Sequence, residues 1–163
     1  MAKTLYSYKS KIHGNGLCLK EGAKKGEKIA TISGDVHVFR EITPEISKKM
    51  RDWIGVGRHS WIDTTNSEFK YINHSCSPNV AIKGKRTVYA LNDIPPKTEI
   101  TMDYSLTEAE PGWGIKNCRC KTEKCRESIG PISSLPTTVF KSTKKIIPKN
   151  FQRIYYVDSS TKN

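Results

Sequence analysis

The sequence lacks any long hydrophobic stretch. Hydrophobic residues make up 36% of its 163 positions, and they occur in short runs separated by charged residues, glycine and proline. No run approaches the roughly 20 apolar residues of a membrane-spanning helix, and positions 1–11 contain no apolar stretch as long as that of a secretion signal. We therefore expect a protein without a membrane segment that acts inside the cell, in a nucleus or in a bacterial or archaeal cytoplasm.

Acidic residues are scarce relative to basic ones. Sixteen Asp and Glu stand against 28 Lys and Arg, which gives a formal net charge of +12. The imbalance is pronounced in residues 131–163, where six basic residues accompany a single acidic one, Asp158. A field of this sign attracts nucleic acid and acidic partners, although it can equally serve only to keep the surface solvated. Nucleic-acid association is therefore one of two interpretations of the charge.

The short apolar runs predict a mainly β fold. A chain of this length has room for one domain. Alternating or apolar runs bounded by turn residues are typical of strands, and we expect them at residues 17–19, 29–32, 36–39, 80–82, 87–91 and 99–102. One short helix is expected over residues 43–53, because Thr43 can cap it and Pro44 can occupy its first turn. From Ser133 onward we expect in part a linker, docked through the aromatic cluster at 154–157.

Cysteines are few but closely spaced. Cys118, Cys120 and Cys125 are too tightly packed along the chain for good disulfides, but their thiols can converge on one Zn²⁺ ion. A tetrahedral site needs a fourth ligand, and Cys76 is the candidate. Three free surface thiols are the disfavoured alternative, because their basic neighbours would make them reactive. Cys18 lies between two leucines and is expected to be a small buried residue.

Four short blocks occur in a characteristic order. They are His13-Gly14-Asn15-Gly16-Leu17, Tyr71-Ile72-Asn73-His74-Ser75-Cys76-Ser77-Pro78-Asn79, Glu99-Ile100-Thr101-Met102-Asp103-Tyr104 and Cys118-Arg119-Cys120-Lys121-Thr122-Glu123-Lys124-Cys125. Each block alone is a weak signal. Together, over about residues 10–130, they resemble the SET-domain protein-lysine methyltransferases that carry a zinc-binding post-SET segment.

The resemblance implies a fold and a division of the chain. The fold would consist of small curved β-sheets with few short helices, and the Asn73–Cys76 segment would form a knot-like crossing with the segment that ends at Tyr104. Such threading is an exception among protein folds. Residues 1–106 would be the SET domain, residues 107–130 the post-SET zinc-binding segment, and residues 131–163 a basic C-terminal extension.

The resemblance also implies a cofactor, S-adenosylmethionine. Its binding residues would be Gly14, Asn15, Gly16, Leu17, Tyr71, Asn73 and His74. The first four would approach it through backbone groups, Asn73 and His74 through side chain and backbone, and Tyr71 as part of the pocket wall. Without the other blocks, the same residues would be interpreted as turn glycines and a core histidine.

Tyr104 is the expected catalytic residue. Methyl transfer from a sulfonium to an amine needs a neutral lysine held in line with the methyl group. Tyr104 would orient that amine through its hydroxyl, and we do not assign it as a general base. If zinc orders the post-SET segment, Trp113 or Ile129 could cover the cofactor and one side of the lysine channel.

Two functions from different classes follow. The first is an S-adenosylmethionine-dependent protein-lysine N-methyltransferase that modifies a histone, another chromatin or nucleoid component, or a different protein. The second is a catalytically idle SET-like module that binds nucleic acid or a partner protein. The joint presence of Asn73, His74 and Tyr104 favours the enzyme, because an idle module does not need all three.

Overall fold

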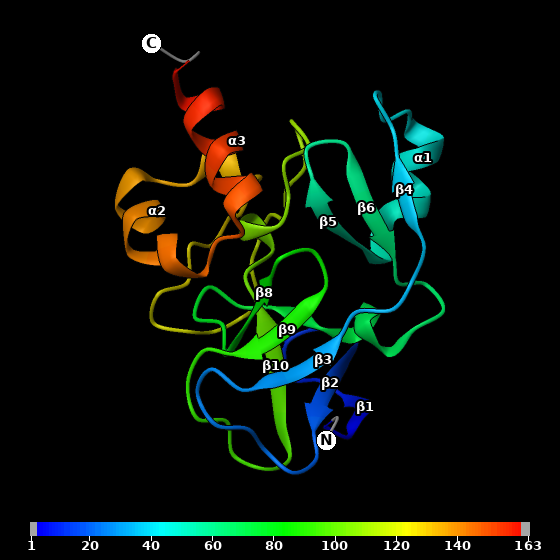
Figure 1. The fold of residues 1–163 in the computed structure, drawn as a ribbon, viewed down its shortest axis with the longest axis vertical. Helices are drawn as coiled ribbons and strands as arrows, with labels where there is room; N and C mark the ends of the chain where they lie inside the picture. The colour runs from blue at the N-terminus through cyan, green and yellow to red at the C-terminus, as the bar shows by residue number, and fades with distance from the viewer. Residues whose placement is uncertain (1–2, 161–163) are drawn as a thin grey trace.

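The fold is built from three small β-sheets (Figure 1), and the computed structural model describes residues 3–160. The first sheet has the order β1 (Leu5–Lys9), β2 (Asn15–Leu19), β10 (Thr98–Met102), β7 (Asn73–His74). The second contains β3 (Lys28–Thr31), β9 (Thr87–Ala90) and β8 (Val80–Lys83), in that order. The third contains β4 (Val36–Val38), β6 (Ser60–Asp63) and β5 (Trp53–Gly57).

The helices are short, apart from the last. They are α1 (Pro44–Lys49), η1 (Met50–Asp52), η2 (Glu68–Tyr71), η3 (Tyr104–Leu106), η4 (Ile132–Ser134), α2 (Thr137–Thr143), η5 (Lys144–Ile146) and α3 (Lys149–Ser160), where η denotes a 3₁₀ turn. Within residues 3–160, none of these helices combines the length and the apolar character needed to cross a membrane.

The helix expected over residues 43–53 is present but shorter. Thr43 caps α1, since its Oγ1 accepts a hydrogen bond of 3.4 Å from the backbone N–H of Ile46, and Pro44 occupies the first turn. The chain then tightens into η1 and enters β5 at Trp53. The pairing of Trp53 with Asp63 in the third sheet ends the helical segment.

All six expected strands overlap observed ones, but β1, β5, β6 and β7 were not predicted. The sequence of β5, Trp53-Ile54-Gly55-Val56-Gly57, contains two glycines, which are poor strand formers. The structure shows why Gly55 is there: a Cβ at this position would lie 2.0 Å from the carbonyl oxygen of Thr107. Position 55 is therefore glycine because the backbone of Thr107 passes close to it. The pattern of residues within the strand gives no sign of such a contact.

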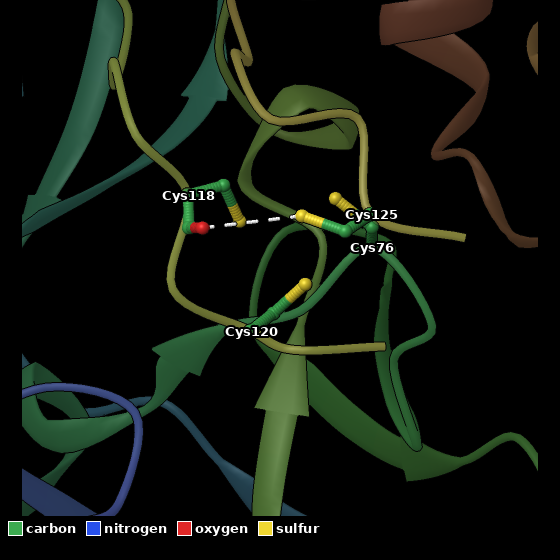
Figure 2. A group of neighbouring side chains, drawn as sticks. All are labelled: Cys76, Cys118, Cys120 and Cys125. Carbon is green, nitrogen blue, oxygen red and sulfur yellow. Dashed lines mark hydrogen bonds between the residues drawn. The ribbon is translucent and has the colours of Figure 1, made fainter. Parts of the chain in front are cut away.

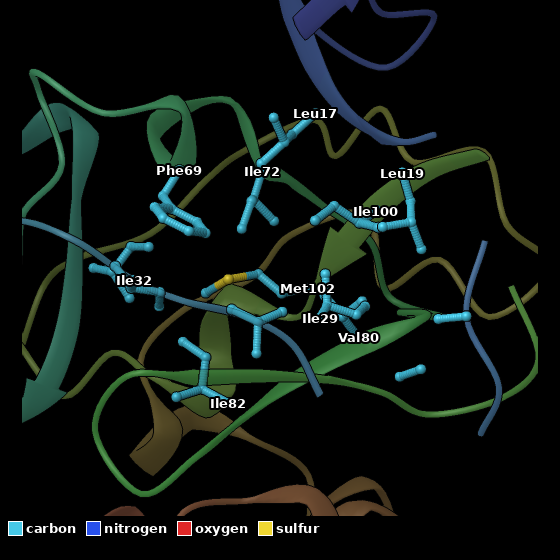
Figure 3. Packing of buried hydrophobic residues seen from close by; sticks show 14 of the residues in the cluster. Leu17, Leu19, Ile29, Ile32, Phe69, Ile72, Val80, Ile82, Ile100 and Met102 are labelled. Carbon is cyan, nitrogen blue, oxygen red and sulfur yellow. The ribbon is translucent and has the colours of Figure 1, made fainter. Parts of the chain in front are cut away.

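The main hydrophobic core is formed by residues of all three sheets and of η2, and Figure 3 shows its part between the first two sheets. Leu17 from β2 and Ile100 from β10 are fully buried and face Ile29 from β3 and Val80 from β8. Met102, near the end of β10, closes the cluster beside Phe69 and Ile72. The core thereby fixes the strand that leads directly into Tyr104.

The C-terminal residues form a second hydrophobic cluster, and the expectation of a partial linker is wrong for residues 137–160. Helices α2 and α3 pack together above β8 and β9 in the view of Figure 1, with the rings of Phe140 and Tyr155 stacked 3.6 Å apart. The cluster comprises Leu106, Ala109, Ile132, Leu135, Phe140, Ile147, Phe151, Ile154 and Tyr155. The other part of the expectation, that the segment docks through its aromatic end, is confirmed, because Ile154 and Tyr155 are buried in this cluster.

The two segments of the expected crossing lie side by side. Strand β7 pairs in parallel with β10, Asn73 opposite Thr101 and His74 opposite Met102. The Ser75 N–H continues this pairing by donating to the Met102 carbonyl at 3.0 Å. Because the two strands run in the same direction, the residues that follow each of them emerge at the same end of the sheet.

Replacing Phe151 by alanine should destabilise the protein by about 3–5 kcal/mol, the usual cost of emptying an aromatic core position. Phe151 on α3 is 1% exposed. Val157→Ala, at a position on the same helix that is 59% exposed, is the matched control and should change the free energy of unfolding by less than about 0.5 kcal/mol. Urea denaturation measures both, and equal effects would contradict the packing of α3 described above.

Candidate functional site

Tyr104 lies at the end of β10, where the strand turns into η3, and both its polar groups are anchored. Its hydroxyl donates to the carbonyl of Ile72 at 2.6 Å, and its backbone N–H donates to Nδ1 of His74 at 3.2 Å. Burial raises the pKa of Tyr104 well above its ordinary value, and the negative charges of Asp52 and Glu99 add to the shift. The hydroxyl therefore stays protonated at neutral pH and cannot serve as a base.

Two hollows of about 330 Å³ each meet at Tyr104. We call the first the apolar hollow; its lining includes Met50, Trp53, Ile54, Phe69, Ile72, Met102, Trp113 and the carboxylates of Asp52, Glu108 and Glu110. The second, the polar hollow, is lined by Ile12, His13, Asn73, His74 and residues 115–119. Tyr104 and Ile115 line both. The tyrosine thus stands where two molecules, one from each side, could meet.

Of the seven expected cofactor residues, Asn73 and His74 line the polar hollow. The Asn73 amide nitrogen donates to the carbonyls of His13 and Asn15, at 3.1 and 3.0 Å. It thereby holds the turn around Gly14, whose φ of +48° favours glycine.

The remaining expected cofactor residues do not line the polar hollow. Leu17 is fully buried in the main core, so that only its backbone could contact a ligand. Tyr71 is partly buried against the same core and lines neither hollow.

Glu99 is a site residue that the sequence did not single out. Its carboxylate accepts hydrogen bonds from the Tyr8 hydroxyl (2.5 Å), the Ser10 hydroxyl (2.9 Å) and the Asn73 amide (2.8 Å). A Cβ on residue 16 would lie 2.4 Å from Glu99 Oε1, which explains why residue 16 is glycine. The sequence did contain a signal for this role, because Glu99 is the acidic residue of an otherwise uncharged strand. A carboxylate that becomes partly buried in a strand needs hydrogen-bond donors around it.

The structure brings the four expected metal ligands together. The sulfur atoms of Cys76, Cys118, Cys120 and Cys125 all lie within 4.8 Å of one another (Figure 2). Four thiolates around a zinc ion at about 2.3 Å would lie about 3.8 Å apart, so a small contraction would complete the site. This cysteine cluster could therefore hold a metal ion. Cys18 is buried in β2 and is not part of it.

Backbone and side-chain donors surround the sulfur atoms of the cysteine cluster. Cys76 Sγ accepts from the N–H of Arg126 at 3.4 Å, and Cys125 Sγ from the N–H of Glu127 at 3.5 Å. Burial by itself raises the pKa of Cys120, but a hydrogen bond from Thr122 and further donors outweigh it and lower the pKa to about 6. These donors stabilise the thiolate of Cys120, the form in which cysteine binds metals, whereas burial raises the pKa of Cys76 and of Cys118.

His74 connects the cysteine cluster to Tyr104. Burial lowers the pKa of His74 to about 4 in spite of the opposing charge of Asp103, so the ring is neutral near pH 7. Because Nδ1 accepts the Tyr104 N–H, the ring proton is on Nε2, which lies 3.3 Å from Cys76 Sγ. One imidazole thus bridges a cluster sulfur and the backbone of the tyrosine.

An ion pair fastens the cysteine-bearing loop to the strand before Tyr104. Arg126 Nη2 lies 2.6 Å from a carboxylate oxygen of Asp103, whose side chain is 2% exposed, and 3.4 Å from the Ser105 hydroxyl. Arg126 follows Cys125 directly, and Asp103 directly precedes Tyr104. The pair therefore sets the position of the loop relative to the tyrosine.

The same loop contributes to the apolar hollow. Trp113 lines this hollow with its ring 6.5 Å from that of Tyr104, and it does not line the polar hollow. Ile129 is buried, and its backbone pairs with that of Ile115 in both directions at 2.9 and 3.0 Å. Of the two residues expected to cover the site, Trp113 is thus the one beside Tyr104, and Ile129 holds the loop in place.

A family model described as the SET domain matches residues 14–105. The chain belongs to the SET-domain family. The match covers the turn at Gly14, strands β7 and β10, and Tyr104, and it confirms both the resemblance found in the sequence and the fold of small sheets with few short helices.

Curated relatives include several methyltransferases. The SET-domain chain is 30% identical over 138 residues to histone-lysine N-methyltransferase 2B of Homo sapiens, and 33% identical over 142 residues to the variant-silencing SET domain-containing protein of Plasmodium falciparum. It is 28% identical over 139 residues to an H3 lysine-4-specific histone-lysine N-methyltransferase of Schizosaccharomyces pombe. These alignments cover 75%, 76% and 76% of the chain but only 5%, 6% and 15% of the relatives. They support methyltransferase function.

Replacing Arg126 by glutamine should lower the free energy of unfolding by about 3–5 kcal/mol, because it leaves the buried Asp103 carboxylate without its partner. Asp103→Asn combined with Arg126→Gln should recover much of this loss, since no unpaired charge is then buried. Lys124→Gln, on the exposed surface of the same loop, serves as the control. Urea denaturation with zinc in all samples gives the comparison, and a double variant no better than Arg126→Gln would contradict it.

Proposed function

We propose that this SET domain is an S-adenosylmethionine-dependent protein-lysine N-methyltransferase. The observation that carries the proposal is the position of Tyr104 at the junction of the two hollows, with its hydroxyl fixed on the Ile72 carbonyl. We assign the apolar hollow to the lysine side chain and the polar hollow to the cofactor. The methyl group would then pass from one hollow to the other beside the tyrosine.

The apolar hollow prepares the lysine. A free lysine has a pKa of about 10.4 and must lose its proton before it can attack a methyl group. Apolar side chains such as Trp53, Phe69 and Trp113 exclude water and favour the neutral amine, and a sulfonium in the neighbouring hollow would add to this by charge repulsion. The carboxylates of the hollow act in the opposite direction. When bound, S-adenosylmethionine would supply a methyl group activated on a sulfonium, with a neutral thioether as the leaving group.

Tyr104 orients the reacting amine in this proposal. Its hydroxyl proton is committed to the Ile72 carbonyl, and its oxygen can still accept a hydrogen bond from the amine. The raised pKa of the Tyr104 hydroxyl keeps the proton in place, in agreement with an orienting and polarising role. Holding the nitrogen in line with the methyl–sulfur bond is the main contribution that such a reaction requires.

We propose that Gly14, Asn15, Gly16, Leu17, Tyr71, Asn73 and His74 bind the cofactor. No atom lies within 4 Å of where a Gly14 Cβ would be, so the outer side of this turn is open to a ligand. The Asn73 amide is engaged with the turn, and we therefore assign its contact with the cofactor to the backbone, as for residues 14–17. Tyr71 lines neither hollow, and its assignment to the wall of the cofactor pocket rests on the family resemblance alone.

We further propose that Cys76, Cys118, Cys120 and Cys125 bind one structural Zn²⁺. The donor set fits, because four thiolates in tetrahedral reach are the composition of a closed zinc site. We keep the division into a SET domain (1–106), a post-SET segment (107–130) and a basic extension (131–163). In this arrangement the post-SET segment supplies three ligands and the SET domain one.

The substrate that we propose is a lysine within a basic protein segment. The apolar hollow is lined by three acidic residues, Asp52, Glu108 and Glu110, and by two basic ones, Arg51 and Lys70. The excess of carboxyl groups could attract neighbouring positive charges of the substrate. The names of several relatives specify histone lysines, which makes a histone or another chromatin or nucleoid protein our first choice. Action inside the cell, in the nucleus or in a bacterial or archaeal cytoplasm, belongs to the same proposal.

Tyr104→Phe should reduce methyl transfer about 100-fold or more, because the lysine loses its orienting group. Transfer of labelled methyl groups from S-adenosylmethionine onto purified histones and a cell extract measures this. Tyr156→Phe, on the exposed part of α3, is the control and should retain wild-type activity. If the wild type binds zinc and cofactor but labels nothing, the alternative of a catalytically idle binding module is favoured instead.

The purified protein should contain one zinc per chain by elemental analysis. Cys125→Ser should lose the metal and, with it, the fixed position of the post-SET segment, so that thermal stability falls. Cys18→Ser, which removes a cysteine outside the cluster, should keep the full zinc content. Undiminished zinc in Cys125→Ser would show that these four cysteines are not the ligands.

A further inference from the structure

A groove of about 800 Å³ lies between the β8–β9 hairpin and the C-terminal helices. It shares no lining residue with the apolar or the polar hollow. Six lysines line it and no carboxylate does; they are Lys28, Lys83, Lys141, Lys144, Lys145 and Lys149. We call it the lysine groove.

The two walls of the lysine groove come from distant parts of the chain. Lys28 on β3 and Lys83 on β8 form one wall, and the lysines of residues 141–149 form the other. Figure 1 shows the segment from α2 to the start of α3 above the β8–β9 hairpin. The groove therefore exists only once the C-terminal cluster has docked.

The backbone that carries the second wall is held rigidly. Gln152 is buried, and its side-chain amide nitrogen donates to the carbonyls of Lys144 and Ile147, at 2.9 and 2.8 Å. Ile147 is itself buried in the second hydrophobic cluster. The lysines thus project from a fixed turn.

The charges in the groove are not neutralised within the described residues. All six lysines are exposed, and none of them forms an ion pair within residues 3–160. The one acidic residue of α3, Asp158, is engaged with Arg58 at 2.6 Å. Six like charges gathered around one groove repel each other, and a polyanion would relieve that repulsion.

The lining favours phosphates over bases. Lysine binds phosphate as a point charge, and the groove contains no arginine, whose planar guanidinium suits bidentate contacts with base edges better. Single-strand binders need exposed aromatic rings on which bases stack, whereas Tyr89, the aromatic residue of the lining, is only partly exposed. The half-exposed ring of Tyr156 lies beside the groove, but Lys144 Nζ lies over it, 5.4 Å from its centroid. The Gln152 amide nitrogen is already engaged with the backbone.

We propose that the lysine groove binds the phosphate backbone of a double-stranded nucleic acid without preference for base sequence. The site lies apart from Tyr104 and does not depend on the methyltransferase proposal. It would hold the domain on a duplex by charge alone, through contacts from both walls.

Fluorescence anisotropy with the full chain and a labelled 20-bp duplex tests the proposal, first with DNA and then with RNA of the same sequence. Affinity should fall steeply with salt, because each lysine–phosphate contact contributes about 0.9 to the slope of log K against log salt. Lys144→Gln with Lys145→Gln should weaken binding about tenfold at low salt and reduce the slope by about 2. Lys28→Gln with Lys83→Gln should act similarly from the other wall.

Lys48→Gln with Lys49→Gln is the matched control. It also neutralises two adjacent exposed lysines, but at the end of α1, and it should bind the duplex as the wild type does. Circular dichroism melts of all variants separate loss of binding from loss of folding. Binding of either duplex supports the proposal, and a preference for one of them identifies the source of the phosphates.

Three results would overturn the proposal. The first is absence of duplex binding by the wild type at low salt, and the second is equal weakening by the groove and control variants, which would indicate diffuse charge. The third is tighter binding of a single strand or of polyglutamate than of either duplex, which would assign the groove to another class of ligand.

Discussion

The parallel pairing of β7 with β10 is the constraint on which the rest of the site depends. It joins only two residue pairs, Asn73 with Thr101 and His74 with Met102, yet the chains that leave both strands carry the chemistry. One leads into Tyr104 and the other into Cys76. Since parallel strands release their chains at the same end, the tyrosine, the polar hollow and the cysteine cluster share one neighbourhood, with the His74 ring between them.

The loop of residues 107–130 contains little regular structure, so it depends on specific contacts for its position. The isolated bridge between Ile115 and Ile129 closes it, and the buried pair of Arg126 with Asp103 attaches it to β10. A buried ion pair adds little net stability compared with apolar packing, but it specifies one arrangement. The proposed zinc would act in the same direction, by joining three sulfur atoms of the loop to Cys76 of the SET domain.

Local sequence patterns predicted the parts of the fold in which packing follows local periodicity. The expected strands are apolar runs, and most of the observed strands overlap them because the run faces a core. Strand β4 is the exception, since Val36 and Val38 are exposed and the strand is held by its pairing with β6. Prediction failed where a distant contact decides the outcome. Gly55 is set by the backbone of Thr107, and Gly16 by the Glu99 carboxylate. The C-terminal helices were missed because serine, threonine, proline and lysine mask the residues of the second cluster, among them the stacked Phe140 and Tyr155.

The sequence by itself determined the family, the mainly β class and the chemical types available: a tyrosine after a strand, thiols at metal-ligand spacing and an excess of lysine. Only the tertiary structure decided which of these groups meet. Glu99 joins Tyr8 and Asn73, and Lys28 joins the C-terminal lysines across one groove. The physical reason is that residue type and spacing govern local conformation, whereas contacts between distant residues depend on the path of the chain around its two hydrophobic clusters.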